Sequence, residues 1–172
     1  TSVDLRQIGA ILRNRPVILA NIGYFGHMWE LYAMWAWFLA FATSAEQTGT
    51  GVANASLLTF AVIAIGLPGC AFGGWLADRI GRCLTTMLMM GLSGFSAFLI
   101  GFAYDSTAWA FVLVALVWGF TVIADSAQFS AAITELSEPH LVGSSLAFQM
   151  GVGFALTIIV IWLIPLLAEA LG

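Results

Sequence analysis

The sequence predicts an all-α fold, a polytopic bundle of transmembrane helices. Of its 172 residues, 61% are hydrophobic and only 8% are charged, whereas a soluble domain carries about 25% charged residues. A water-soluble surface on a chain of this length needs far more charge, so we expect lipid to solvate most of it. The chain also contains long apolar stretches between short polar breaks, and each stretch exceeds the roughly 20 residues that cross a bilayer as a helix.

The apolar stretches divide the chain into a short leading helix and a transmembrane bundle. Residues 1–15 are expected to form an amphipathic cytoplasmic linker helix, because Leu5, Ile8 and Leu12 share one face. Such a helix suits a membrane surface or a connection between two bundles. Residues 16–172 are expected to form the bundle. Its five predicted spans cover about 16–43, 51–77, 83–103, 107–133 and 142–170.

Arginine positions predict the orientation in the membrane. The chain has no Lys, and with five alternating spans all its basic residues fall on one side: Arg6, Arg13, Arg15, Arg79 and Arg82. By the positive-inside rule, that side is cytoplasmic. The prediction is a multi-pass protein of the cell inner membrane with a cytoplasmic N-terminus.

Several function classes find no support in the sequence. The few Arg residues form no basic patch, so no nucleic-acid partner is expected. The sequence holds no HExxH, GxSxG or nucleotide-binding loop, so we predict no enzymatic activity, no cofactor and no metal. The two cysteines, Cys70 and Cys83, do not make a disulfide framework and are expected to be packing residues.

The most specific short pattern is GWLADRIGR, from Gly74 to Arg82, between the second and third spans. Gly81 permits a sharp reversal of the chain, and Arg79 and Arg82 hold the turn on the cytoplasmic side. Asp78 can pair with an Arg or approach the positive N-terminus of a helix. The simpler alternative is a polar hairpin loop with no further role.

This pattern, G-x-L-x-D-R-x-G-R, closely resembles the signature loop of the major facilitator superfamily, which joins the second and third helices of a six-helix half. Residues 24–37 resemble the seventh helix of bacterial permeases of that superfamily, and residues 118–154 resemble its tenth helix and the start of the eleventh. The resemblance implies helices seven to eleven of the C-terminal half. Residues 1–15 then end the linker between the halves. We therefore expect a fragment that lacks the twelfth helix and the N-terminal half.

The resemblance also implies roles for the loop residues. In the family, the aspartate and arginines of this loop form a charge network that steadies one alternating-access state. Carried over, that network comprises Asp78, Arg79 and Arg82, with Gly74 and Gly81 as the glycines of the motif.

Polar residues at membrane depth are costly and are functional candidates by default. His27 and Glu30 lie three residues apart in the first span, Asp125 and Gln128 lie three apart in the fourth, and Gln149 lies in the fifth. Halves of this superfamily contain two three-helix repeats, and the first and fourth spans are their equivalent, cavity-lining first helices. We predict that these five residues line a substrate or proton pathway.

Two roles remain open for these residues. Desolvation favours the neutral form of a carboxyl group, so Glu30 or Asp125 can take up and release a proton, with His27 as a partner of Glu30. Alternatively, the pairs His27–Glu30 and Asp125–Gln128 form structural hydrogen-bond networks.

Glycines offer a packing prediction. Gly69 and Gly73 have the spacing that lets transmembrane helices approach closely. We expect Gly91, Gly94, Gly151 and Gly153 to serve the same end.

The predicted function is one half of a secondary active transporter, moving a small solute by alternating access with proton coupling. Its expected partners are the lipid bilayer, a small-molecule substrate, and the missing other half or a second membrane subunit. One alternative is a transporter-derived structural or assembly subunit of a larger membrane complex. Another is a half-transporter that forms homodimers.

Overall fold

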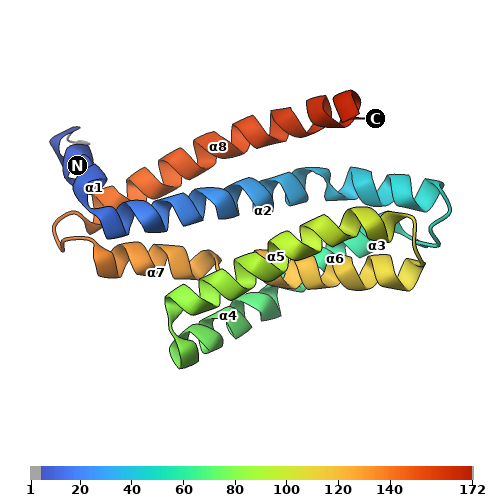
Figure 1. Ribbon diagram of the computed structural model, residues 1–172, viewed down its shortest axis with the longest axis horizontal. Helices are drawn as coiled ribbons and strands as arrows, with labels where there is room; N and C mark the ends of the chain where they lie inside the picture. The colour runs from blue at the N-terminus through green and yellow to red at the C-terminus, as the bar shows by residue number, and fades with distance from the viewer. Residues whose placement is uncertain (1–4, 172) are drawn as a thin grey trace. The chain divides into compact units, whose positions relative to one another are not determined.

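The computed structural model describes residues 5–171, with side chains from residue 7 to 170, and is all-α (Figure 1). Residues 1–4 of the predicted linker, and residue 172 of the predicted bundle, lie outside the described part. The segments are α1 (Leu5–Arg13), α2 (Arg15–Gln47), α3 (Ala55–Ala64), α4 (Gly66–Ile80), α5 (Arg82–Tyr104), α6 (Ala108–Val122), α7 (Ser126–Leu136) and α8 (Val142–Leu171). Only Ile65 separates α3 from α4 and only residues 123–125 separate α6 from α7, so these segments make six helices.

Four of these helices are long and apolar enough to cross a membrane: Ala55–Ile80, Arg82–Tyr104, Ala108–Leu136 and Val142–Ala170. They confirm the predicted all-α class and suggest a multi-pass membrane protein. Helix α2 covers the first predicted span, about 16–43, as one continuous helix. It is not among the four because glycines, His27 and Glu30 lower its mean hydropathy. A membrane crossing by α2 therefore stays a prediction.

The chain forms two compact units, which we call the first and second unit. Within the described residues, the first unit comprises residues up to Trp29 and from Ser126 onward, and the second comprises Glu30–Asp125. The chain passes between them inside α2 and again between α6 and α7. The predicted division after residue 15 separates a linker from the membrane-spanning bundle, whereas the two units are defined by how compactly their residues pack. The predicted division therefore stays a prediction.

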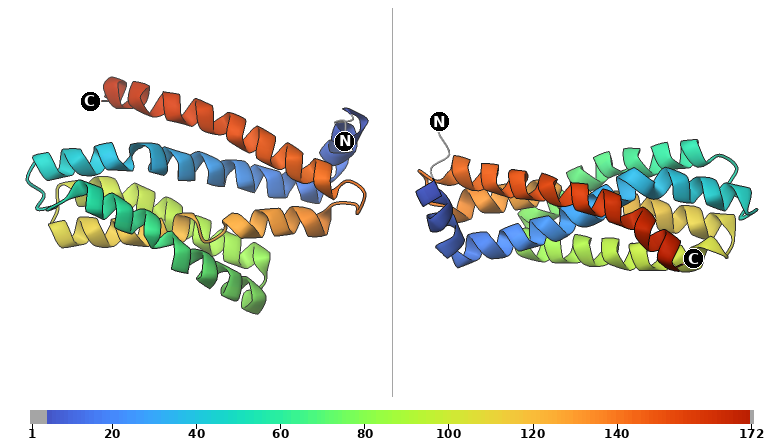
Figure 2. Two further views of the ribbon diagram at one scale, coloured as in Figure 1. Left: turned by 180° about the vertical axis from the view of Figure 1, so that it is seen from behind. Right: turned by 90° about the horizontal axis from the view of Figure 1, so that it is seen from above.

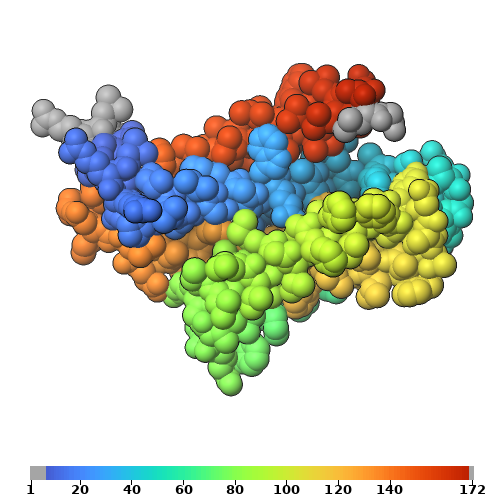
Figure 3. Space-filling view, viewed as in Figure 1, coloured from blue at the N-terminus to red at the C-terminus, as the bar shows by residue number. Residues whose placement is uncertain are grey.

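Helix α5 in the second unit exposes apolar side chains and buries several polar ones. Its buried face includes Thr85, Ser93 and Ser96. Its outer face, in view in Figure 3, exposes large apolar side chains: Leu84, Met87, Leu88, Leu92, Phe95, Phe98 and Phe102. Soluble proteins place these residue types the other way round. The distribution suits a helix whose outer face meets lipid.

Helix α8 in the first unit shows the same reversal. Ser145, Gln149 and Thr157, which are four and then eight residues apart, are all buried. The opposite face exposes Met150, Phe154, Ile158, Ile159, Trp162 and Leu166. Because residues four apart share one face of a helix, α8 turns a polar stripe inward and an apolar surface outward.

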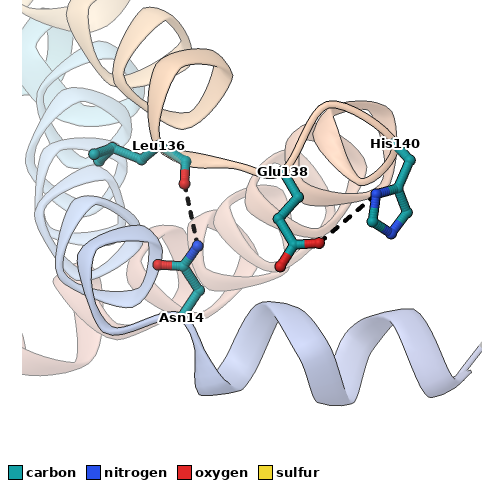
Figure 4. Close-up of polar contacts among 4 residues, drawn as sticks. All are labelled: Asn14, Leu136, Glu138 and His140. Atoms are coloured by element: carbon teal, nitrogen blue, oxygen red, sulfur yellow. Dashed lines mark hydrogen bonds and ion pairs between the residues drawn. The ribbon is translucent and has the colours of Figure 1, made fainter.

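At one end of the first unit, polar contacts join the helix ends. The Asn14 side-chain amide, at the junction of α1 and α2, donates to the carbonyl oxygen of Leu136 at 3.1 Å (Figure 4). The Ser144 hydroxyl of α8 donates to the Gln7 amide oxygen of α1 at 2.5 Å. In the loop between α7 and α8, the Nδ1 atom of His140 lies 3.7 Å from the Oε2 atom of Glu138, and both side chains are exposed. These contacts fix α1 against the ends of α7 and α8.

The face that α1 buries differs from the predicted one. Ile11 is only 2% exposed, whereas Leu12 is 54% exposed. Ile11 packs in a cluster with Val17 of α2 and Ile133 of α7. The helix therefore turns Ile11 toward protein, because α2, α7 and α8 supply a closer apolar surface than the membrane does.

Pro68 explains the interruption between α3 and α4, which follow one another from teal to green in Figure 2. A proline inside a helix has no N–H and its ring clashes with the carbonyl four residues earlier. That carbonyl belongs to Ala64, where α3 ends. Pro68 itself lies in the first turn of α4, where a missing N–H costs little.

The predicted fourth span, about 107–133, is not one continuous helix. Helix α6 ends at Val122, and the amide of Ala124 donates to Thr121 at 3.2 Å, which is a tighter turn than an α-helix makes. The Cys70 thiol donates to the carbonyl oxygen of Ile123 at 3.3 Å, so α4 satisfies a backbone group that the break leaves open. The break ends at Asp125.

Glycines let the backbones of the second unit touch. A Cβ on Gly69 would lie 2.2 Å from the carbonyl oxygen of Phe120, and a Cβ on Gly73 would lie 2.0 Å from that of Ala124. A Cβ on Gly119 of α6 would lie 2.0 Å from the carbonyl oxygen of Val62 in α3. Only glycine fits at these three positions. The prediction for Gly69 and Gly73 is confirmed.

The same prediction is wrong for three other glycines. Gly91, Gly94 and Gly151 have no atom within 4 Å of an added Cβ, because they lie on outward faces. Gly153 does pack closely, with a Cβ position 2.6 Å from the Tyr24 ring.

Gly73→Ala should destabilise the second unit, because its new methyl group would overlap a backbone oxygen that cannot move alone. Overpacking of this kind costs about 1–3 kcal/mol. Chemical unfolding in detergent measures the free energy of unfolding. Gly91→Ala is the matched control, since its Cβ enters open space and should cost nothing. Equal losses in the two variants would contradict the close packing.

Candidate functional site

Glu30 ties together three helices of the second unit. Its Oε1 atom accepts a hydrogen bond from the Ser93 hydroxyl of α5 at 2.6 Å. The same oxygen accepts one from the Trp118 indole N–H of α6 at 2.9 Å. The carboxylate therefore joins α2, α5 and α6.

His27 is the centre of a buried aromatic cluster in the first unit. Its Nε2 atom lies 2.8 Å from the Ser126 hydroxyl at the start of α7. Its ring centre lies 5.5 Å from that of Phe129 and 6.2 Å from that of Tyr24. Tyr24 and Phe129 meet edge to face, with ring centres 5.8 Å apart. These contacts fasten α2 to α7.

The predicted pair of His27 and Glu30 falls on the boundary of the two units. Each residue has hydrogen-bond partners within its own unit: Ser126 for His27, and Ser93 and Trp118 for Glu30. A joint role in proton handling stays a prediction. His27 and Glu30 lie three residues apart on α2, and this spacing alone did not predict that they have different hydrogen-bond partners.

Asp125 and Gln128 are both buried, and they belong to different units. Asp125 is 1% exposed and is the last residue of the non-helical turn after α6. Gln128 lies in the first turn of α7 and belongs to the first unit. A buried carboxyl group is costly unless its charge is compensated or neutralised.

Gln149 is completely buried, and neither its amide nitrogen nor its amide oxygen has a hydrogen-bond partner among the described residues. Asn21 of α2 is 1% exposed, and its Oδ1 atom likewise has no partner in the described part of the chain. The Nδ2 atom of Asn21 donates to the carbonyl of Val17 at 2.8 Å. Sequence analysis missed Asn21, although it stands one turn before Tyr24 in an apolar helix.

The charged turn of the signature pattern joins α4 to α5. Gly81 has φ 86° and ψ 154°, in the region that favours glycine. Its amide donates to Ala77 at 3.0 Å, which closes α4. The guanidinium carbon of Arg79 lies 5.2 Å from the centre of the Trp75 ring, within cation–π distance. Asp78 precedes this arginine, and Arg82 begins α5.

Gly74 lies in α4 with no atom within 4 Å of an added Cβ. Its place in the pattern therefore has no packing explanation in this structure.

Comparison with protein-family models, with curated proteins and with solved structures finds no significant match. Within the described residues, no group of three or more His, Cys, Asp or Glu side chains comes together to hold a metal ion. The arrangement instead offers hydrogen-bonding and aromatic groups buried among transmembrane-length helices.

Glu30→Leu should destabilise the second unit, because it leaves the Ser93 hydroxyl and the Trp118 N–H without an acceptor. Each buried unpaired donor costs about 1–3 kcal/mol. Glu30→Gln should cost much less, since a carboxamide oxygen can still accept both bonds. The free energy of unfolding in detergent measures both variants.

Glu169→Leu is the control for losing a carboxylate, because Glu169 is exposed near the end of α8. A loss as large in Glu169→Leu as in Glu30→Leu would show that the hydrogen bonds of Glu30 contribute nothing specific.

Proposed function

We propose that the chain is part of one half of a secondary active transporter of the major facilitator type. It moves a small solute by alternating access, coupled to protons, in the cell inner membrane. Its N-terminus is cytoplasmic, and α2 crosses the membrane with the four apolar helices. The remaining half of the transporter, or a second membrane subunit, completes the solute path.

The charged turn from Gly74 to Arg82 carries this proposal. It lies between two helices of transmembrane length, Ala55–Ile80 and Arg82–Tyr104. Its reversal uses Gly81 at positive φ, and this position is one of the two glycines of the motif. The reversed polarity of α5 and α8 supports the lipid environment that the proposal needs.

Asp125 is the proposed proton carrier. Non-helical backbone at membrane depth is tolerated where it is buried in protein or lines a cavity. Transporters use interrupted helices to build such solute and ion sites. The break between α6 and α7 places the buried carboxyl of Asp125 at an interruption of this kind.

The contacts of Glu30 favour the alternative function, in which the chain is a structural or assembly subunit of a larger membrane complex. Its two hydrogen bonds serve to hold helices together. If Asp125 is also structural, no acid at membrane depth remains to couple protons. A transport measurement separates the two functions.

Asp125→Asn should abolish solute-driven proton movement in the intact protein. Vesicles loaded with a pH-sensitive dye report proton uptake after a pulse of a sugar, an amino acid or an organic acid. Asn has nearly the same shape but cannot release a proton. Glu169→Gln is the control and should behave like the wild type. If no solute drives protons in the wild type, or if Asp125→Asn is fully active, proton-coupled transport is wrong.

Arg82→Ala should slow transport by about tenfold, or about 1.4 kcal/mol, if the charged turn steadies one state of the transport cycle. The initial rate of solute uptake into the same vesicles measures this effect. Cys83→Ser is the matched control, because Cys83 is the next residue and is exposed. Equal rates in the two variants would assign the turn a connecting role only.

A further inference from the structure

Two exposed arginines flank the corner between α1 and α2 in the first unit. Arg13 is the last residue of α1, Arg15 is the first residue of α2, and both are exposed. Their Cα atoms lie at most about 7 Å apart, because an extended chain advances about 3.5 Å per residue. Among the described residues, neither arginine forms an ion pair. Both positive charges are therefore available to one anionic ligand.

Asn14, which lies between the two arginines, holds this corner in place. Its Oδ1 atom accepts a hydrogen bond from the backbone amide of Val17 at 3.4 Å. Its Nδ2 atom donates to the carbonyl oxygen of Leu136 at the end of α7, at 3.1 Å (Figure 4). The arginines therefore project from a corner that contacts within the first unit fix.

An exposed apolar stripe runs along α2 from Arg15. Leu19, Ile22 and Trp29 follow Arg15 by four, seven and fourteen residues, which places all four on one face of the helix. The three apolar side chains are 59%, 60% and 37% exposed. Fourteen residues cover about 21 Å of helix, and one leaflet of a bilayer contains about 15 Å of hydrocarbon. The stripe is therefore long enough to contact a whole acyl chain.

This combination specifies an amphiphile with an anionic head. Arginine binds phosphate oxygens through its planar fork of N–H donors. Free phosphate or an acidic peptide would use the arginines and leave the apolar stripe uncovered. A lipid without net charge would cover the stripe and leave the two positive charges uncompensated. An anionic phospholipid complements both features.

We propose that Arg13 and Arg15, with the apolar stripe of Leu19, Ile22 and Trp29, form a binding site for an anionic phospholipid of the cytoplasmic leaflet. The arginines hold the phosphate, and an acyl chain lies along the stripe. The site rests on the proposed membrane crossing of α2 with a cytoplasmic start, but not on transport. It differs from general contact with the bilayer because it selects the lipid by the charge of its headgroup.

Fluorescence quenching by brominated lipids tests this site in the intact protein. Cys70 and Cys83 are replaced by Ser, Ile22→Cys is labelled with bimane, and the protein is placed in phosphatidylcholine vesicles. Brominated phosphatidylglycerol should bind beside position 22 about 25-fold more strongly than brominated phosphatidylcholine, because each arginine near an anionic headgroup contributes about fivefold.

Met150→Cys, labelled in the same way, is the matched control. Met150 is 49% exposed and lies eight residues into α8, whereas Ile22 lies seven residues into α2. Both lie in the first unit, but α8 contains no arginine. The two lipids should therefore bind about equally beside position 150. A preference for phosphatidylglycerol that is no larger at position 22 than at position 150 would overturn the site.

Arginine variants test which charges hold the lipid. Arg15→Gln should reduce the preference at position 22 about fivefold, and Arg13→Gln together with Arg15→Gln should remove it. Arg79→Gln is the matched control for the loss of one positive charge, because Arg79 belongs to the second unit and stacks on Trp75. It should leave the preference unchanged.

Two results would contradict a lipid site at these arginines. One is a preference that survives the double variant or that falls equally in Arg79→Gln. The other is a preference that millimolar inorganic phosphate abolishes, because the arginines would then bind free phosphate instead of a lipid.

Salt supplies a second measurement that leaves both arginines in place. In about 1 M NaCl the Debye length falls to about 3 Å, so the preference at position 22 should fall toward that at position 150. A preference that salt does not change would mean that charge does not hold the lipid, and the site would fall. Absence of quenching by either lipid at position 22 would overturn both the site and the membrane crossing of α2.

None of these measurements requires transport. A vesicle experiment in which no solute drives protons would therefore overturn the transport proposal and leave this site standing. Equal lipid preferences at positions 22 and 150 would overturn this site and leave the transport proposal standing.

Discussion

The outer faces of α5 and α8 are apolar, so their polar side chains have to be accommodated inside the fold. This constraint shapes both units. Ser93 of α5 finds the carboxylate of Glu30, and Ser126 at the start of α7 finds His27. Where lipid covers a helix, a polar group has no water to which it can form a hydrogen bond. Each inward polar residue therefore needs a partner on another helix or a bound molecule.

Close backbone contact in the second unit has the same origin. Lipid gives no hydrophobic driving force for pressing helices together, so packing and hydrogen bonds must do so. Gly69, Gly73 and Gly119 let backbones meet where any side chain would overlap a carbonyl oxygen. The thiol of Cys70 adds a hydrogen bond to Ile123 across that contact. The broken end of α6 is thus held by α4, and this support allows the helix to be interrupted without exposing its backbone to lipid.

Composition and apolar length were enough to predict the all-α class and four of the spans, because these properties are local to the chain. The break at Ala64 also follows from Pro68. The break before Asp125 does not, since the carbonyl oxygen of Ile123 accepts its hydrogen bond from Cys70 of α4, which is distant in sequence. Glu30 stood out as an acid at membrane depth, but Ser93 and Trp118 lie far along the chain. Asn21 was missed because one amide among apolar residues resembles a tolerated packing position until its burial is known.

The distribution of partners separates two kinds of buried polar residue. Glu30 has two protein donors and joins three helices, so its charge is already used within the fold. Gln149 is buried as deeply as any residue described, yet neither of its polar atoms has a hydrogen-bond partner among the residues that the structure describes. Structural stability alone explains the first arrangement and argues against the second, because an apolar side chain would serve packing better. Gln149 is therefore the buried polar residue whose position the packing of the described residues explains least.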